Sequence, residues 1–304
     1  MIAIPELGSP LSSHPLRVAA IRFLNPAPLM WDFEHEPGKS QLATNYHLQW
    51  MMPAQCADRL VLPADHPDAC DLGLIPIATL ATNPTLRVVP GVSGQPGCAI
   101  ASKGHIRSLI LVRRASQPLS AIRTIAADTS SRSTLAYTQI LFHLWHNPQA
   151  RFLQHPPQLD QMLEAADAAI LIGDPALYAL QERQNLEERT GQELIYHDLA
   201  EEWTALLGVP WISAVWAIRS SALATHSLHS IAADLNASKN HGLANIPALV
   251  EEWSRKLPLP ADSIHDYLSS NIYYHLDEAC LTGMQTFFTL AAEYNILPAY
   301  ELSL

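Results

Sequence analysis

The sequence predicts an α/β protein with two lobes, one of which is assembled from two separate stretches of the chain. Short apolar runs alternate with helical patterns through most of the 304 residues, which is typical of α/β proteins. Beyond Arg219 the pattern changes to helices only, and such a tail needs the N-terminal sheet to pack on. We therefore expect residues 1–100 and 218–304 to form one lobe, and residues 101–217 to form an inserted α/β lobe.

The order of the elements follows from apolar patterning and from proline, which ends a strand because it lacks an N–H group and fixes φ. The expected strands are 18–21, 46–51, 71–76, 97–102, 108–112, 124–127, 151–154, 168–172 and 211–218. The expected helices are 53–60, 133–145, 159–165, 262–275 and 281–294. With this order, the chain would cross between the lobes near residues 99–108 and again near residues 215–219.

Composition and charge limit the class of protein. Hydrophobic residues make up 48% of the chain and charged residues 15%, which supports a substantial core and argues against disorder. The formal net charge of −11 disfavours nucleic acid and anionic membranes as partners, since both need a basic surface. Residues 1–15 lack the pattern of a secretory signal, and no apolar stretch is long enough to span a membrane. The cysteines lack metal-ligand spacing, so we expect free buried thiols in a reducing cytoplasm; they are Cys56, Cys70, Cys98 and Cys280.

The stretch from Arg22 to Leu29 follows the first expected strand and contains Pro26 and Pro28. Asn25 is thereby placed at the carboxyl end of a strand, where open α/β sheets bind their ligands. An Asn before Pro is also a common turn residue. The polar segments farther along the chain favour the functional interpretation, which makes Asn25 a candidate catalytic residue.

A polar turn at residues 128–134 joins an expected strand to an expected helix. The unpaired N–H groups and the dipole of a helix N-terminus suit a carboxylate or a phosphate. One or two hydroxyl groups would be enough for an N-cap, and residues 130–134 alone hold four together with an arginine. It therefore predicts an anion site whose candidate residues are Ser130, Ser131, Arg132, Ser133 and Thr134.

Two more segments hold candidate ligand-binding residues. The polar loop 101–108 is either a simple hairpin between two strands or part of a site, and Ser108 at its end is a candidate donor. Gly173 and Asp174 follow a buried strand, and Pro175 suits the first turn of the helix that comes next. We therefore predict that Asp174 caps this helix, a role that is compatible with catalysis.

Other kinds of site find little support in the sequence. Two histidine pairs, at 143/146 and 226/229, would share a helix face, but no His-Glu-x-x-His motif and no carboxylate at ligand spacing accompanies them, so we expect no metal. Gly-x-Gly-x-x-Gly, Walker and Gly-x-Ser-x-Gly motifs are absent. We expect the aromatic-rich segment 267–274 to pack in the core.

Taken in order, these segments resemble the chorismate dehydratase family of the futalosine route to menaquinone. The matching pieces are 23–29, 71–76, 102–108, 128–134, 166–174, 198–203, 208–217 and 287–292. The likeness covers about residues 17–297. His105 stands where the family pattern usually has proline, and Ser133-Thr134 replaces the more usual Thr-Ser.

The resemblance implies the fold of type II periplasmic binding proteins, with two α/β lobes and a ligand cleft between them. It implies a carbon–oxygen lyase that dehydrates the dianion chorismate to 3-[(1-carboxyvinyl)oxy]benzoate without a cofactor. Asn25 and Ser108 would be catalytic, whereas the hydroxyl-rich turn, Gly173 and Asp174 would bind the substrate. Two alternatives stay open: a non-catalytic binding protein for a small carboxylate, and the naphthoate synthase of the same pathway, whose opening Cys-Pro-Asn-Asp-Thr motif is absent from this chain.

The segments assigned to the cleft hold few titratable bases, which favours the substrate as its own base. The enolpyruvyl carboxylate of chorismate is tethered close to the C3 proton, and well-oriented intramolecular placement is worth roughly 7–11 kcal/mol. A general base must reach its proton within hydrogen-bond distance. The protein residues that could serve instead are His105 and Asp174.

Overall fold

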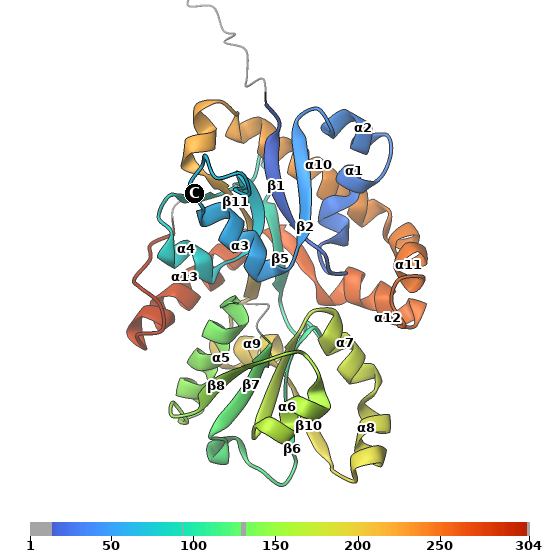
Figure 1. The fold of residues 1–304 in the computed structure, drawn as a ribbon, viewed down its shortest axis with the longest axis vertical. Coiled ribbons are helices and arrows are strands. Elements are labelled where there is room, and N and C mark those ends of the chain that lie inside the picture. Colours follow the sequence, from blue (N-terminus) through green and yellow to red (C-terminus); the bar gives the residue numbers. More distant parts are fainter. Residues whose placement is uncertain (1–13, 93, 129–131, 303–304) are drawn as a thin grey trace, which may run out of the picture.

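The computed structural model describes residues 14–92, 94–128 and 132–302, and it has a mixed α/β fold of two lobes (Figure 1). In the described residues each lobe is built on one sheet: a seven-stranded sheet of order β12-β5-β11-β3-β1-β2 with β4 paired to β11, and a five-stranded sheet of order β10-β6-β9-β7-β8. The strands are β1 Leu16–Ile21, β2 Tyr46–Met51, β3 Leu72–Pro76, β4 Leu86–Val88, β5 Gly97–Ser102, β6 Leu109–Arg114, β7 Thr124–Asp128, β8 Arg151–His155, β9 Ala168–Ile172, β10 Leu194–Asp198, β11 Trp211–Arg219 and β12 Tyr273–Leu276.

Helices surround both sheets. They are α1 Trp31–Glu34, α2 Gly38–Leu42, α3 Pro53–Val61, α4 Ala78–Thr82, α5 Arg132–Leu144, α6 Leu159–Ala165, α7 Asp174–Gln181, α8 Arg183–Thr190, α9 Leu199–Leu207, α10 Leu228–Ala244, α11 Ile246–Ser254, α12 Ala261–Asp266 and α13 Glu278–Glu293. Shorter helical turns are η1 Ala27–Met30, η2 Leu119–Ala121, η3 Ser220–Ala224 and the π-helical turn η4 Tyr267–Asn271. Of the expected helices, 53–60, 133–145, 159–165 and 281–294 are confirmed as α3, α5, α6 and α13, each within one to three residues at its ends.

The first lobe places the end of β1 at the centre of the molecule. β1 pairs in parallel with β2 and β3, and β3 pairs antiparallel with β11. The interior of this sheet is almost wholly apolar, since every residue of β3 and β5 is buried and Ser102 is the one hydroxyl side chain among them. β1 ends at Ile21, before the two prolines, and the chain then turns into η1, as predicted from the loss of the proline N–H groups.

The crossings between the lobes differ in part from the prediction. β5 pairs with β11 and β12 in the first sheet, whereas β6 pairs with β9 and β10 in the second. The segment 103–108 is therefore a crossing between sheets, and the hairpin interpretation of the 101–108 loop is wrong. The return crossing lies at residues 208–210, because β11 already belongs to the first sheet. The expected boundary at residue 217 is thus about one strand too late: β11 is buried along nearly its whole length because it lies inside the first sheet, between β3 and β5.

The C-terminal tail is not purely helical, and this corrects a second expectation. The predicted helix 262–275 ends at Asp266, continues as η4 and becomes the strand β12, which pairs antiparallel with β5. Ile272, Tyr273 and Tyr274 are residues that favour strands, and β5 has an edge that accepts one. Helical spacing and strand alternation both fit such a short apolar run, so periodicity alone predicted the wrong element.

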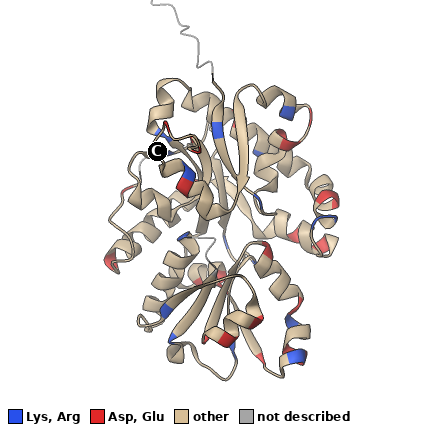
Figure 2. Cartoon of the chain, viewed as in Figure 1, with Lys and Arg blue, Asp and Glu red and all other residues tan. Residues whose placement is uncertain are grey.

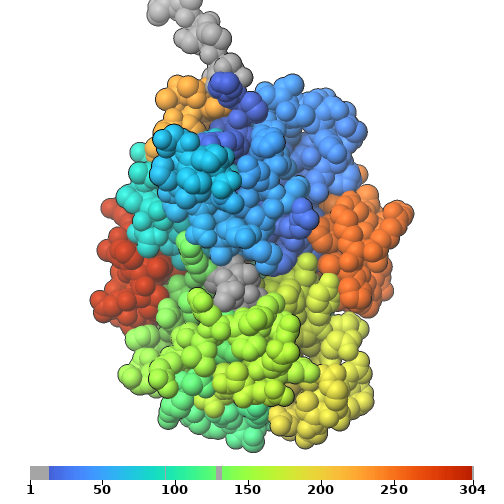
Figure 3. Space-filling model, in the orientation of Figure 1, coloured from blue at the N-terminus to red at the C-terminus, as the bar shows by residue number. Residues whose placement is uncertain are grey.

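An apolar core connects the two lobes. The largest cluster of buried residues contains residues from both sheets, and Tyr137 of α5 stacks on Trp211 of β11 with ring centroids 3.8 Å apart. Tyr137 also contacts Phe287 of α13, at 4.2 Å between centroids. In space-filling view the two lobes meet along the middle of the molecule (Figure 3). The two lobes therefore pack against each other through these aromatic side chains.

Two sequence expectations concern the whole chain. The four cysteines are free and buried, as predicted. In the part of the chain that the structure describes, no helix is long and apolar enough to cross a membrane. Acidic and basic residues are interspersed over the outer helices of both lobes (Figure 2).

Candidate functional site

A small cavity of about 40 Å³ lies where the two lobes meet. Its walls come from both sheets, and the polar groups among its lining residues are Asn25, Ser108, Thr134, Gly173 and Ser213. Hydrophobic side chains form the rest; they are Ile21, Phe23, Pro53, Pro76, Ile100, Leu109, Ile172 and Ala214. Four of the residues that the sequence nominated, Asn25, Ser108, Thr134 and Gly173, are thus brought together although consecutive ones are about 26 to 83 residues apart in the chain. We refer to this space as the cleft cavity.

Asn25 supplies the most informative atom of the cleft cavity. It follows the carboxyl end of β1, and its Oδ1 is buried with no hydrogen-bond partner among the described residues. A buried amide oxygen without a partner is costly, of the order of 1–3 kcal/mol. Because native structures leave few such groups unpaired, this one points to a ligand that fills the cavity and donates a hydrogen bond.

Ser108, at the end of the first crossing segment, lines the cleft cavity together with Asn25. Its side chain is buried, and its backbone oxygen accepts the N–H of Gly173 at 2.8 Å, which joins the start of β6 to the end of β9. Tyr267 of η4 lies beside Ser108, and its hydroxyl is buried. Burial raises the pKa of Tyr267 far above its usual range, and the Ser108 hydroxyl acts in the opposite direction. Both hydroxyl groups are therefore neutral hydrogen-bonding groups at ordinary pH.

Gly173 is required at its position for two independent reasons. Its φ of +62° and ψ of −142° lie in a region that essentially only glycine adopts. A Cβ atom there would also lie 2.8 Å from the ring of Phe23, which comes from the other lobe. Gly173 therefore allows the lobes to touch at the edge of the cleft cavity.

Asp174 does not have the capping role that the sequence predicted. The helix α7 begins at Asp174 itself, Gly173 occupies the N-cap position, and no side chain caps the helix. The Oδ1 atom of Asp174 instead accepts the backbone N–H of Leu24 at 3.2 Å, a bond between the lobes. Burial raises the pKa of Asp174 to about 6, and the Leu24 bond acts in the opposite direction. Asp174 is absent from the lining of the cleft cavity, and its carboxyl group is connected to the site through Leu24, the residue before Asn25.

The hydroxyl-rich turn divides into residues with different surroundings. Ser130 and Ser131 lie outside the described residues. Arg132 is half-exposed and pairs with Asp58 of α3 in the other lobe, which corrects the expectation that it faces the ligand. The Ser133 Oγ accepts the backbone N–H of Ala78 at 3.0 Å, also across the lobes, which withdraws it from the cavity. Thr134 is buried and lines the cleft cavity.

Ser213 is a lining residue that sequence reasoning missed. It belongs to β11, where its Oγ accepts the indole N–H of Trp211 at 2.9 Å and its backbone oxygen accepts the N–H of Ile77 at 3.3 Å. A signal was available, because an isolated polar residue inside an apolar strand marks a face that meets something polar. The erroneous assignment of this strand to the second lobe hid it.

Asp198 is a second residue that sequence reasoning did not single out for a role. Its Oδ2 accepts the backbone N–H groups of Ile106 and Arg107, at 2.9 and 2.6 Å, and its Oδ1 caps α9 by accepting from Ala200 and Glu201. Arg107 has a φ of +63°, which this pair of bonds holds in place. Asp198 thus fixes the shape of the first crossing, and with it the position of Ser108.

His105 lies away from the cleft cavity. Its side chain is 64% exposed, and its Nδ1 is 3.5 Å from the Glu201 carboxylate. Among the described residues, the lining of the cleft cavity includes no Lys, Arg or His and no carboxylate. A ligand there would be held by amide, hydroxyl and backbone groups. No group of three or more His, Cys, Asp or Glu residues in the described chain is arranged to hold a metal ion.

Comparison with known proteins identifies the family. A family described as menaquinone biosynthesis matches residues 16–293, which is most of the chain. The chain belongs to this family. The match begins at β1 and ends at the last residue of α13, so it contains every residue described here as lining the cleft cavity.

Solved structures place the fold. Protein AF1704 from Archaeoglobus fulgidus has a TM-score of 0.66 at 14% identity, with 94% of this chain and 99% of that one covered. The Candida albicans CA3427 gene product, described as having the generic periplasmic binding protein fold, has a TM-score of 0.61 at 14% identity over 96% and 98% of the chains. The alkanesulfonate-binding protein SsuA from Xanthomonas axonopodis pv. citri has a TM-score of 0.61 at 13% identity over 95% and 96%. The predicted periplasmic-binding-protein-like fold is confirmed.

Proposed function

We propose that this protein is a chorismate dehydratase, a carbon–oxygen lyase that makes 3-[(1-carboxyvinyl)oxy]benzoate for menaquinone by the futalosine route. The observation that carries the proposal is the buried Oδ1 of Asn25, which has no hydrogen-bond partner among the described residues and belongs to a residue that lines, together with Ser108, a cavity between two lobes. The menaquinone biosynthesis family supports the pathway. The absence of a basic or acidic lining in the described residues suits a reaction in which the protein orients groups and supplies no base of its own.

The reaction balances without an added reactant. The C3–H bond breaks and its electron pair forms a ring double bond, while the C4–O bond breaks and the hydroxyl leaves as water. The ring becomes aromatic, which supplies the driving force. We propose that the enolpyruvyl carboxylate of the substrate takes the C3 proton, since it is tethered near that atom and His105 is exposed and remote from the cavity.

Each polar residue of the cleft cavity has a proposed task. The Asn25 amide can both donate and accept, and so orients the departing hydroxyl or the enolpyruvyl carboxylate. Ser108 and Thr134 donate from the second lobe, and Ser213 adds a hydroxyl from the first. The N–H groups at the start of α5 are proposed to hold a carboxylate, and Ser130 and Ser131, which precede α5 in the sequence, are proposed to contribute to the same site. Arg132 and Ser133 are proposed to act indirectly, through the lobe contacts that they make.

Gly173 and Asp174 complete the proposal from the second lobe. Gly173 lets Phe23 close over the site, and Asp174 binds Leu24, the residue before Asn25. We propose that the lobes separate to admit chorismate, since the cavity of about 40 Å³ is too small for it. We place this reaction in the cytoplasm, where its free buried thiols would stay reduced.

A binding protein without catalysis is the second candidate, because the same fold serves an alkanesulfonate-binding protein. One experiment separates the two. Purified protein is incubated with an excess of chorismate, and the mixture is followed by absorbance and mass spectrometry. A dehydratase yields several equivalents of an aromatic product lighter by one water, whereas a binding protein returns chorismate intact after denaturation of the complex.

A further inference from the structure

A second and larger pocket lies just outside the cleft cavity. It has a volume of about 250 Å³ and is formed at the end of β1, where Arg22, Phe23, Pro26 and Ala27 line it. Ile21 and Phe23 belong to the walls of both spaces, so the two are separated by little more than the Phe23 side chain. We call this space the outer pocket.

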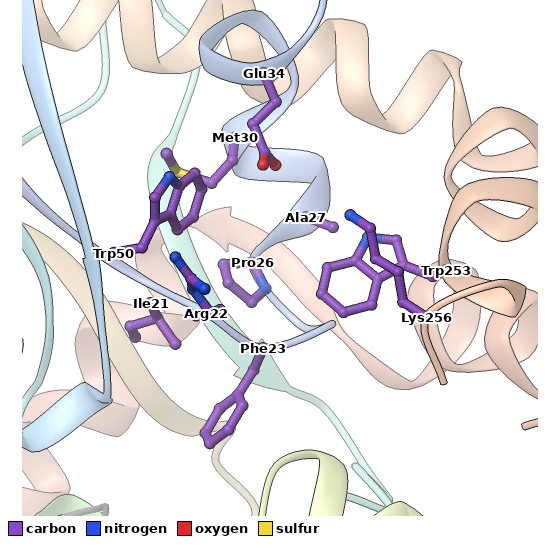
Figure 4. A pocket seen from close by; sticks show the side chains of 10 residues that line it. All are labelled: Ile21, Arg22, Phe23, Pro26, Ala27, Met30, Glu34, Trp50, Trp253 and Lys256. Atoms are coloured by element: carbon purple, nitrogen blue, oxygen red, sulfur yellow. The ribbon is translucent and has the colours of Figure 1, made fainter. Parts of the chain in front are cut away.

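The walls of the outer pocket are flat and aromatic. Trp50 of β2 and Trp253 of α11 stand on opposite sides of it, with Pro26 between them and Met30 next to Trp50 (Figure 4). Both tryptophans are only partly buried and line the pocket, so part of each ring is accessible to a ligand. Aromatic walls of this kind accept a planar ring, because ring pairs gain energy beyond the area that they bury.

The charges of the outer pocket favour an anion. Lys256 is paired with Glu252 and lies over the Trp253 ring, with its Nζ 4.7 Å from the ring centroid. Arg22 is exposed, and no hydrogen bond or ion pair of its side chain is found among the described residues. Its guanidinium points into the pocket beside Trp50 (Figure 4). It is therefore a free five-donor group with a geometry that matches a carboxylate.

Glu34 is the one acid in the lining, at the upper end of the pocket (Figure 4). Burial raises its pKa above the ordinary value, while Lys256 lowers it. The protonated form is thereby favoured more than for a free glutamate. Glu34 therefore repels a bound anion less than an exposed carboxylate would.

We infer that the outer pocket is a binding site for a planar aromatic carboxylate, with the ring between Trp50 and Trp253 and the carboxylate on Arg22. The inference rests on the proposed function only for the natural ligand, which would be the aromatic product on its way out of the cleft cavity. The product is a benzoate, and on its way between the two spaces it would pass Ile21 and Phe23, which line both. Binding of an aromatic carboxylate in the outer pocket does not depend on catalysis in the cleft cavity.

Benzoate is the probe, because it has the ring and the carboxylate and cannot be dehydrated. Calorimetric and tryptophan-fluorescence titrations are made on the full chain and on Arg22→Gln and Trp253→Leu. A hydrogen-bonded ion pair is worth about 1.5–3 kcal/mol, so Arg22→Gln should weaken benzoate binding roughly ten- to a hundredfold. Arg151→Gln removes an exposed arginine of β8 and should leave binding unchanged, and Glu34→Gln should leave it equal or tighter.

Three results would overturn the inference. Benzoate could fail to bind the wild-type chain at millimolar concentration. Arg22→Gln and Trp253→Leu, both shown to fold by circular dichroism, could give the wild-type isotherm. Benzylammonium could bind where benzoate does not, with loss on Glu34→Gln, which would make the pocket a cation site. These experiments measure binding of benzoate and not dehydration. They therefore test the inference even if the proposed function is wrong.

Discussion

Asp174 gives a sharp quantitative test of how the lobes meet. Its carboxyl group is enclosed between α7 and the Leu24 backbone, and burial raises its pKa from an ordinary 3.8 to about 6. Each pKa unit corresponds to about 1.4 kcal/mol, so ionised Asp174 costs the folded state about 3 kcal/mol. Asp174→Asn keeps an oxygen for the Leu24 N–H and removes the charge. We therefore expect the substitution to stabilise the protein at neutral pH.

The pH dependence follows from linkage. Between pH 3.8 and about 6 the folded state holds a proton that the unfolded chain has lost, so this contribution to stability falls as the pH rises through that window. Asp174→Asn should thus unfold at a higher urea midpoint than wild type at pH 7.5. The difference in free energy of unfolding between the two proteins should be about 2 kcal/mol larger at pH 7.5 than at pH 4. Urea unfolding at both pH values measures it. Asp65→Asn, an exposed loop residue, is the control of equal charge.

A gap between wild type and Asp174→Asn that is the same at both pH values would refute the reasoning. It would mean that the Asp174 carboxyl is hydrated and that the Leu24 contact is open.

The same variant also tests the identity of the base. If Asp174 removed the C3 proton, the turnover of chorismate by folded Asp174→Asn would fall by three or more orders of magnitude.

The remaining predictions concern the cleft cavity and the contacts around it. Asn25→Asp should weaken chorismate binding in calorimetry, because it puts another negative charge beside a dianion; equal affinity would contradict this. Gly173→Ala should cost about 1–3 kcal/mol of stability from its φ alone and should weaken ligand binding as well, because its Cβ meets Phe23; unchanged affinity and urea midpoint would show that the lobes do not close there. Arg132→Ala breaks a surface ion pair and should change stability by less than about 1 kcal/mol, as urea unfolding will show. His105→Asn and Asp128→Asn should each keep turnover within about tenfold of wild type, and a loss of three orders of magnitude at either would identify a protein base.

The sequence predicted the strands well where patterning and proline agreed. β1, β2 and β3 follow the expected bounds within two residues, since apolar runs ended by Pro26 and Pro76 leave little freedom. It failed where one apolar run fits two elements, as in β12. The sequence also assigned β11 to the wrong lobe. The partners of a strand are set by residues far away in the chain, and the sequence of a buried strand does not show which sheet it joins.

The candidate site was predicted in part. Asn25, Ser108, Thr134 and Gly173 do meet, because strand ends and helix starts gather at the same edge of an α/β lobe. Arg132 and Ser133 stand next to Thr134 in the sequence but point at the other lobe, and only the helix geometry of α5 decides this. Residues one apart on a helix face different directions, so richness in hydroxyl groups could not show which of them reaches the ligand.

The central claim is that the cleft cavity dehydrates chorismate with Asn25 acting on the reacting groups. The most direct measurement is turnover and affinity for chorismate in wild type and Asn25→Ala, with the product quantified by mass. We expect many turnovers in wild type, and in Asn25→Ala a kcat lower by roughly a hundredfold or more with a much smaller change in Kd, as for an interaction made mainly in the transition state. Chorismate returned unchanged by the wild-type protein, or normal turnover by Asn25→Ala, would contradict the claim.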